Sequence, residues 1–172
     1  MAKPKRPTKK LKKTLIFVGE GPAEKAFLAH LKSHYGVGSL RVTPKSAGGK
    51  GPENIIGDAI STLENSKCDQ VAVLLDTDLP WPAKYVKEAN KLDIELIGST
   101  PCLEGLLLTI LRQHHPNPSD NKRCKKALHP QLTGKETEKE SYQALFTKQI
   151  LDEAAADVAE LKRLIDLISD KS

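Results

Sequence analysis

The sequence predicts an α/β protein with a mostly parallel, four-stranded sheet flanked by helices, and with further helices toward its C-terminal end. Three observations support this fold class. Short apolar segments alternate along the chain with segments of helical period, as they do when helices cover both faces of a parallel sheet. The segment at residues 70–75 is a continuous apolar run, which is typical of a strand buried on both faces. Clusters of Gly, Pro and Asp follow the apolar segments and indicate where the strands end.

The first half of the chain contains two predicted strand–helix units. Residues 14–18 are β-branched and apolar, and a Gly-Glu-Gly-Pro cluster ends them. A helical pattern follows from Ala23, with Pro22 suited to the first helical position. Residues 39–43 form a weaker strand, and a glycine-rich loop then leads to a helix at residues 53–63.

The second half continues the alternation and then becomes helical. Its expected elements are, in chain order, a strand at 70–75, a helix at 82–91, a strand at 94–97, an apolar helix at 103–112, a loop at 114–134, and amphipathic helices at 139–151 and 154–168. The loop is expected because its residues are rich in Pro, Asn and Lys.

The composition is ordinary for one soluble globular domain. The chain has 172 residues, of which 28% are charged and 38% apolar, against about 100–200 residues for a typical domain. Aromatic residues make up only 4%, so the core must be aliphatic. We divide the chain into a basic flexible arm at residues 1–13, an α/β core at 14–112, and a loop with a C-terminal helical extension of the same domain at 113–172.

The charge distribution suits an anionic partner such as nucleic acid. The formal net charge is +5, and seven of the 27 Lys and Arg residues lie within the first 13 positions. Two readings of this basic arm stay open. It is either a solubilising tail or an arm that contacts phosphates.

The cysteines and the apolar runs bear on where the chain resides. The three cysteines are widely spaced and form no CxxC pair, so neither a zinc knuckle nor a redox motif is indicated. Their odd number, without a signal peptide, favours the reducing cytoplasm. No apolar run approaches the roughly 20 residues that a spanning helix needs, so no membrane association is expected.

Five acidic residues lie just after predicted strands. Glu20 follows the first strand and Glu24 comes one helical turn later, while Asp76 and Asp78 end the most apolar strand and Glu104 opens the helix after the last. Because the carboxyl ends of parallel strands share one edge of a sheet, these side chains are expected to meet. Alternate residues of an extended chain point the same way, so both aspartates can face one ion.

A cluster of this kind predicts a divalent metal site. Carboxylates that lie close together repel one another, and a hard cation removes that cost. Mg²⁺ (or Mn²⁺) prefers oxygen ligands, and the absence of well-placed Cys or His argues against zinc. Taken singly, Asp76 and Asp78 are better explained as turn formers or helix caps, and Glu104 as a charge at a helix start. Glu20, between two glycines, is harder to explain in that way.

Three segments carry a resemblance to a known family. Residues 18–24, VGEGPAE, resemble the first motif of TOPRIM domains, and the extra acid at Glu24 is similar to the OLD-type branch. Residues 75–78, LDTD, resemble the TOPRIM Asp-x-Asp motif. Residues 99–108 resemble the Ser-x-Pro-Cys-Phe-Glu segment of RloB-like proteins, small TOPRIM relatives that occur with bacterial defence and restriction loci.

The resemblance covers about residues 14–112 and has two departures. Leu103 stands where an aromatic residue is usual, and Gly105 stands where relatives often carry a bulky one. The resemblance implies a TOPRIM-like sheet and a Mg²⁺-dependent nuclease that hydrolyses phosphodiester bonds of DNA or RNA, with a role in bacterial defence.

The resemblance also suggests roles for the acids. Glu20, Asp76 and Asp78 would hold one ion, with Glu24 beyond it or acting through water. Glu104 would help to hold a second ion about 4 Å away. Glu20 and Glu104 are also the expected catalytic acids. A catalytic lysine is expected downstream, and we favour Lys135 among four candidates, the others being Lys122, Lys125 and Lys126.

Other readings stay open. The chain is alternatively a catalytically weak nucleic-acid-binding or regulatory subunit that partners an ATPase. His114, His115 and His129 are interpreted mainly as loop residues or helix caps rather than as catalytic groups. The loop around Lys50 lacks the spacing of a Walker motif and is interpreted as flexible, or as a contact for a nucleic-acid backbone.

Overall fold

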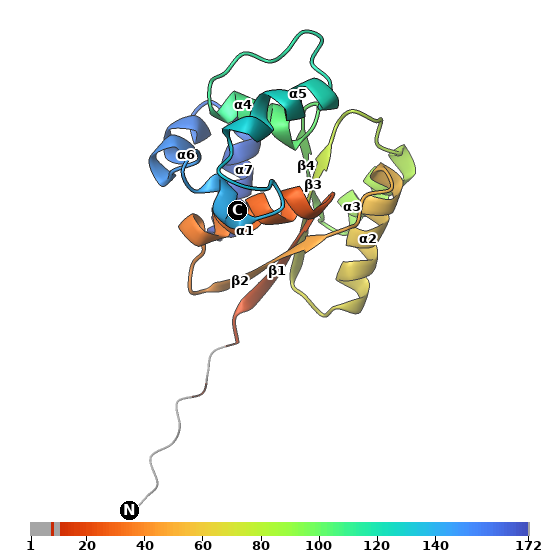
Figure 1. Cartoon of the computed structure of the whole chain (residues 1–172). Coiled ribbons are helices and arrows are strands. Elements are labelled where there is room, and N and C mark those ends of the chain that lie inside the picture. The colour runs from red at the N-terminus through yellow and green to blue at the C-terminus, as the bar shows by residue number, and fades with distance from the viewer. Residues whose placement is uncertain (1–7, 9–10, 172) are drawn as a thin grey trace, which may run out of the picture.

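The computed structural model describes residue 8 and residues 11–171 of the chain (Figure 1). The predicted basic arm at residues 1–13 therefore lies largely outside the described residues, and its role stays a prediction. The first regular element begins at Lys13, one residue before the strand that the sequence predicts.

Four parallel strands form a single sheet, as the sequence predicts. They are β1 (Lys13–Gly19), β2 (Leu40–Ser46), β3 (Gln70–Asp76) and β4 (Glu95–Ser99). Their order across the sheet is β2-β1-β3-β4, and every neighbouring pair is parallel. All the carboxyl ends therefore lie at one edge, where the predicted acids follow them.

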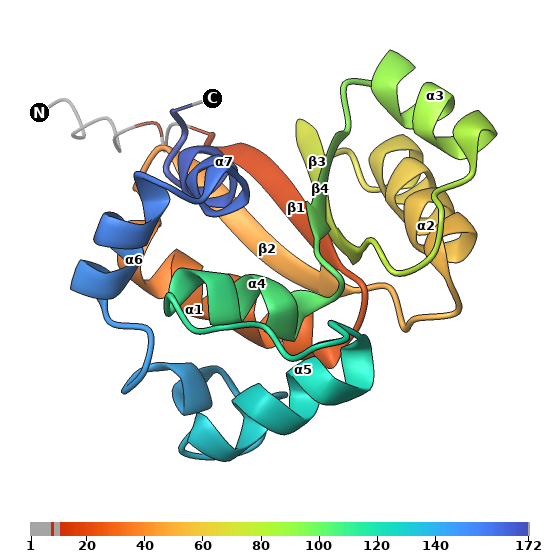
Figure 2. The same ribbon diagram turned by 90° about the horizontal axis from the view of Figure 1, so that it is seen from above.

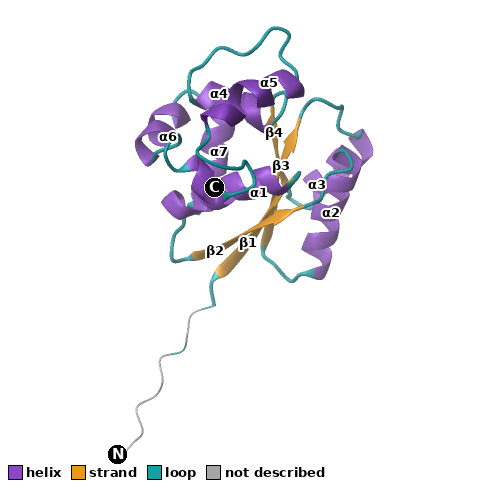
Figure 3. Cartoon of the chain, viewed as in Figure 1, coloured by secondary structure: helices purple, strands orange, loops and turns teal. Residues whose placement is uncertain are grey.

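Seven α-helices and two short 3-10 turns lie within the described part of the chain (Figure 3). Pro22 occupies the first turn of the first helix, as expected. The helices are α1 (Pro22–Tyr35), α2 (Pro52–Asn65), α3 (Ala83–Lys91), α4 (Leu103–Ile110), α5 (Asn121–Leu128), α6 (Lys148–Ala155) and α7 (Ala159–Ile168), and the 3-10 turns are η1 (His129–Gln131) and η2 (Lys139–Tyr142).

The helices divide between the two faces of the sheet. Seen from above, α2 and α3 lie on one side, and α1 and α4 to α7 lie on the other (Figure 2). A hydrophobic core lies on each face of the sheet. Successive residues of β3 belong to the two cores in turn, because side chains of a strand alternate between its faces. Ala72 and Leu74 belong to the larger core, and Val71, Val73 and Leu75 to the smaller one.

The prediction of a loop at residues 114–134 is wrong over residues 121–128, which form α5. The side chain of Asp120 caps this helix by accepting a hydrogen bond from the N–H of Arg123 (2.8 Å). Only Cys124 and Leu128 of the helix are buried. Its other positions are mainly basic, so the sequence shows almost no apolar face there.

The single helix expected at residues 139–151 is also wrong, because the chain breaks within it. The turn η2 ends at Tyr142, and α6 begins only at Lys148. Thr147 starts the new helix by accepting a hydrogen bond from the N–H of Ile150 (3.3 Å). A threonine inside an amphipathic pattern therefore acts here as a cap. The last helix also starts later than expected, at Ala159.

None of the helices in the described residues is long and apolar enough to cross a membrane. The longest, α1 and α2, have 14 residues each.

Candidate acidic site at the carboxyl edge of the sheet

The site is built around Glu20, which follows the last residue of β1. Its backbone N–H donates to the carbonyl oxygen of Leu74 in β3 (3.1 Å). Its side-chain Oε2 accepts a hydrogen bond from the backbone N–H of Asp76 (3.0 Å). The first and third strands are thus joined at their carboxyl ends by the acid that the sequence analysis placed there. Gly19 permits the close turn, since a Cβ at this position would lie 2.6 Å from the Cβ of Glu24.

Asp76 is the most strongly perturbed acid of the site. Its side chain is buried, and its Oδ1 accepts a hydrogen bond from the hydroxyl of Ser99 in β4 (3.1 Å). Burial raises the pKa of Asp76 to about 8, and the negative charges of Glu20 and Glu24 add to the increase, while the Ser99 bond opposes it. A bound cation would favour the ionised form of this carboxyl group.

Glu24 reaches the same place from the first turn of α1. Its Oε2 accepts a hydrogen bond from the N–H of Gly21 (2.9 Å), which holds the carboxylate over the start of the helix. Burial raises the pKa of Glu24, and the charges of Glu20 and Glu104 raise it further, although backbone hydrogen bonds oppose the shift. Burial and neighbouring charges therefore raise the pKa values of two acids of the site, Glu24 and Asp76.

Glu104 is buried at the start of α4 and is paired with a histidine. Its Oε1 lies 2.6 Å from Nε2 of His129, the first residue of η1. From its sequence context, His129 is expected to be a loop residue or a helix cap. This contact spans 25 residues, and no local motif signals it. Gly105 lets the chain turn tightly before α4, because a Cβ there would lie 2.2 Å from the carbonyl oxygen of Thr100.

These acids line a common pocket of about 520 Å³. Its volume is sufficient for a small ligand or for part of a larger one. The pocket is lined by Glu20, Gly21, Pro22, Ala23, Glu24, Ser46, Gly48, Gly49, Asp76, Glu104, Lys125, His129, Glu136 and Thr137. Four of the five predicted metal ligands are therefore brought together, from the ends of β1 and β3 and from the first turns of α1 and α4.

Asp78 is the predicted ligand that the structure does not bring into the pocket. β3 ends at Asp76, and the N–H of Thr77 donates to the carbonyl oxygens of Ser99 (3.0 Å) and Pro101 (3.2 Å). The chain therefore leaves the extended conformation that the expected alternation requires. The exposed carboxylate of Asp78 instead accepts a hydrogen bond from Nδ2 of Asn121 at the start of α5 (2.8 Å).

One of the four candidate lysines lines the pocket, and it is Lys125. Its position on α5, a helix that the sequence analysis assigned to loop, explains why alignment by spacing could not select it. Lys122, Lys126 and Lys135 are not among the lining residues. The glycine-rich loop contributes Gly48 and Gly49 to the wall of the pocket.

The donor set is suited to a hard divalent cation. All four acids present carboxylate oxygens, the ligands that Mg²⁺ and Mn²⁺ prefer. The raised pKa of Asp76 reflects its burial first, and then the negative charges of Glu20 and Glu24 held close to it. Within residue 8 and residues 11–171, however, no three His, Cys, Asp or Glu side chains are already arranged to hold a metal ion. Binding would therefore require side-chain movement.

The fold and the pocket define a class of α/β protein with a parallel four-stranded sheet and an acidic site at its carboxyl edge. A model of the family described as RloB-like protein matches residues 14–166. The chain therefore belongs to the RloB-like protein family, as the resemblance of its motifs indicates. No curated protein and no solved structure matches the chain.

Proposed function

We propose that this chain is a Mg²⁺-dependent nuclease of TOPRIM type that hydrolyses phosphodiester bonds of DNA or RNA, with Mn²⁺ as an alternative ion. The observation that carries the proposal is the hydrogen bond from the N–H of Asp76 to Glu20, which brings acids from two neighbouring strands together in one pocket. Two expectations are parts of this proposal. They are the cytoplasmic location, which the cysteines favour, and the role in bacterial defence, which the resemblance implies.

Glu20, Glu24 and Asp76 are the residues that would hold the ion. When bound, a divalent cation supplies a Lewis acid for the phosphoryl group and a water of lowered pKa. Glu20 is oriented by the backbone of β3, and Glu24 by the N–H of Gly21. Asp78, which lies outside the pocket lining, would contribute only after a rearrangement of the turn that follows β3.

The remaining residues of the pocket would bind and orient the substrate. Lys125 lines the same pocket as the acids and offers a positive charge for a phosphate oxygen. The backbone at Gly48 and Gly49 carries no side chain, so a nucleic-acid backbone can approach it closely. Glu104 holds Nε2 of His129, which leaves the Nδ1 atom of that ring to exchange a proton with the reacting groups.

Incubation with labelled nucleic acids tests the proposal. Single-stranded DNA, double-stranded DNA and RNA are each incubated with Mg²⁺, Mn²⁺ or EDTA. We expect cleavage of at least one substrate that needs the cation and is lost in Asp76→Asn. Glu64→Gln, an exposed acid on α2, is the matched control and should cut as the wild type does. Cleavage that persists in EDTA, or in Asp76→Asn, would refute the proposal.

A nucleic-acid-binding or regulatory subunit that partners an ATPase is the second candidate. It is favoured by one observation, namely that no three His, Cys, Asp or Glu side chains of the described residues are already arranged to hold a metal ion. This candidate predicts nucleic-acid binding that is equal in Mg²⁺ and in EDTA, without cleavage of any of the three substrates. The same set of incubations, read by gel shift as well as by cleavage, separates the two functions.

A further inference from the structure

The two edge strands of the sheet differ in how they are protected. β2 carries Arg41, Pro44 and Lys45, and charged residues and proline are devices by which proteins stop an edge from pairing with another strand. β4, the opposite edge, has the sequence ELIGS and contains neither a lysine nor a proline. Its one charged residue, Glu95, is neutralised by an ion pair with Arg163 of α7. The β4 edge is thus left open to pairing.

The outward-facing backbone groups of β4 follow from its contacts with the neighbouring strand. The carbonyl oxygen of Ser99 accepts a hydrogen bond from the N–H of Thr77, so the backbone of Ser99 faces β3. Alternate residues of a strand direct their N–H and C=O groups to opposite sides. Leu96 and Gly98 therefore point theirs away from β3, where no strand of the described residues pairs with them. An added strand would find two donors and two acceptors there.

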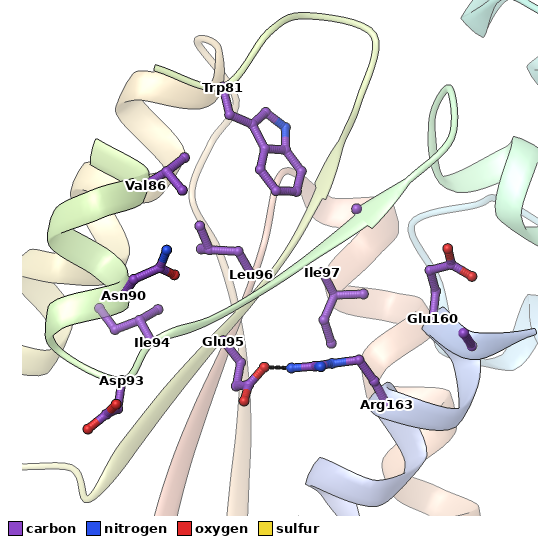
Figure 4. Close-up of a pocket in the computed structure, with 12 residues that line it drawn as sticks. Trp81, Val86, Asn90, Asp93, Ile94, Glu95, Leu96, Ile97, Glu160 and Arg163 are labelled. Atoms are coloured by element: carbon purple, nitrogen blue, oxygen red, sulfur yellow. Dashed lines mark ion pairs between the residues drawn. The ribbon is translucent and has the colours of Figure 1, made fainter. Parts of the chain in front are cut away.

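A groove of about 510 Å³ runs along this edge, between α3 and α7 (Figure 4). Figure 4 shows Trp81, Val86 and Leu96 on the α3 side of β4, and Ile97 on the α7 side. These apolar side chains offer contacts for alternate residues of an extended peptide. Trp81 is held in place by a hydrogen bond from its Nε1 to the carbonyl oxygen of Asp76 (2.9 Å).

The charge of the groove is negative, although the whole chain carries a net charge of +5. Asp93, Glu95 and Glu160 line it with a single basic residue, Arg163, which is already paired with Glu95. Asp93 and Glu160 are exposed, and neither forms an ion pair with another described residue. A ligand that carries positive side chains beside apolar ones is therefore complementary to this groove.

We propose that the β4 groove binds an extended basic peptide segment of a partner protein, which pairs with β4 as a fifth strand. α3 and α7 line the groove on both sides of the edge. A lone strand needs less room between such walls than a second copy, which would bring its own α3 and α7 against them. The site is distinct from the acidic pocket, with which it shares no lining residue, so it does not depend on the proposed nuclease function.

The proposal is tested with an acetylated and amidated heptapeptide of alternating lysine and valine, and with its counterpart of alternating glutamate and valine. Trp81 is the single tryptophan of the chain, so its fluorescence reports on the groove. We expect saturable binding of the lysine peptide, with affinity at least tenfold above that of the glutamate peptide. When the lysine peptide is bound, hydrogen exchange should slow at the backbone amides of Leu96 and Gly98.

Two variants and a matched control complete the test. Leu96→Pro removes an outward N–H at an edge position where proline is tolerated, and Glu160→Lys reverses a charge on the surface of α7. Each variant should lower the affinity for the lysine peptide about tenfold. Glu153→Lys on α6 makes the same charge change outside the groove and should leave this affinity unchanged. Three results would overturn the proposal. The first is that both variants bind the lysine peptide as tightly as the wild type does. The second is that the peptide slows hydrogen exchange at the acidic pocket instead of at β4. The third is that the free protein is a dimer, which Leu96→Pro dissociates.

Discussion

The carboxylate of Glu20 accepts a hydrogen bond from the backbone N–H of Asp76 at 3.0 Å. This contact ties the residue that follows β1 to the last residue of β3, at the carboxyl edge where sites form in parallel sheets. It also orients one carboxylate by a main-chain donor, so the position of Glu20 depends on the sheet rather than on a flexible loop. The proposed metal site is centred on this pair.

The two aspartates of the Asp-Thr-Asp segment should differ in importance. Asp76→Asn removes a carboxylate that lines the pocket, so cleavage should fall on the order of 100-fold or more. Asp78→Asn removes an exposed carboxylate bonded to Asn121, and its effect should be below about tenfold. Single-turnover rates with saturating Mg²⁺ measure both. Equal losses in the two variants would show that Asp78 moves into the site.

The stability of the metal-free protein should fall as the pH rises. The pKa of Asp76 is raised to about 8 in the folded chain, from an ordinary value near 3.8. Between these values the folded chain retains a proton that the unfolded chain has lost. The free energy of unfolding should therefore decrease from about pH 4 to pH 8, by on the order of a few kcal/mol, and level off above.

Urea denaturation in EDTA across this pH range measures the effect, with Asp76→Asn as the control. The variant has no carboxyl group to ionise at this position, so its stability should depend less on pH. Mn²⁺ at pH 8.5 should raise the stability of the wild type and leave that of Asp76→Asn nearly unchanged. A wild-type stability that rises through this range would contradict the assigned pKa of Asp76.

The pair formed by Glu104 and His129 should support the fold as well as the site. His129→Ala leaves the buried Glu104 without its donor at 2.6 Å, which should cost about 1–3 kcal/mol of stability. His129→Gln retains a donor and should recover part of the loss. His114→Ala, at an exposed histidine, is the matched control. Thermal melts compare the four proteins, and a His129→Ala variant as stable as the wild type would argue against the pairing.

The catalytic lysine should be Lys125 rather than Lys135. Lys125 lines the acidic pocket, and Lys135 does not. Lys125→Ala should reduce the cleavage rate on the order of 100-fold, whereas Lys135→Ala should reduce it less than about threefold. Rates measured at saturating substrate separate a catalytic effect from weaker binding. A larger loss in Lys135→Ala would restore the lysine that the sequence analysis favoured.

The sheet and most of the acidic site could be predicted because both depend on local patterns. Apolar runs mark the strands, and in a parallel sheet their carboxyl ends must share an edge. Glu20, Asp76 and Glu104 each lie at or shortly after the end of a strand, so their common location follows from the topology alone. The conformation after Asp76 could not be predicted in this way, because it depends on hydrogen bonds from Thr77 to residues of another strand end.

The remaining parts of the site depend on contacts between distant segments. His129 meets Glu104 across 25 residues, and nothing near either residue indicates the contact. Lys125 lies on a helix whose buried face consists of Cys124 and Leu128, too small to appear as a hydrophobic pattern. Tertiary packing, rather than local propensity, positions both residues.

The most direct measurement is anomalous X-ray diffraction from crystals of the protein grown with Mn²⁺. We predict an anomalous peak bounded by the carboxylates of Glu20 and Asp76, with Mn–O distances of roughly 2.0–2.3 Å as hard cations of this size adopt. The peak should be absent in Asp76→Asn crystals grown in the same way. Well-ordered wild-type crystals without a peak in this pocket, or with Mn²⁺ bound only elsewhere, would contradict a metal site at this edge of the sheet.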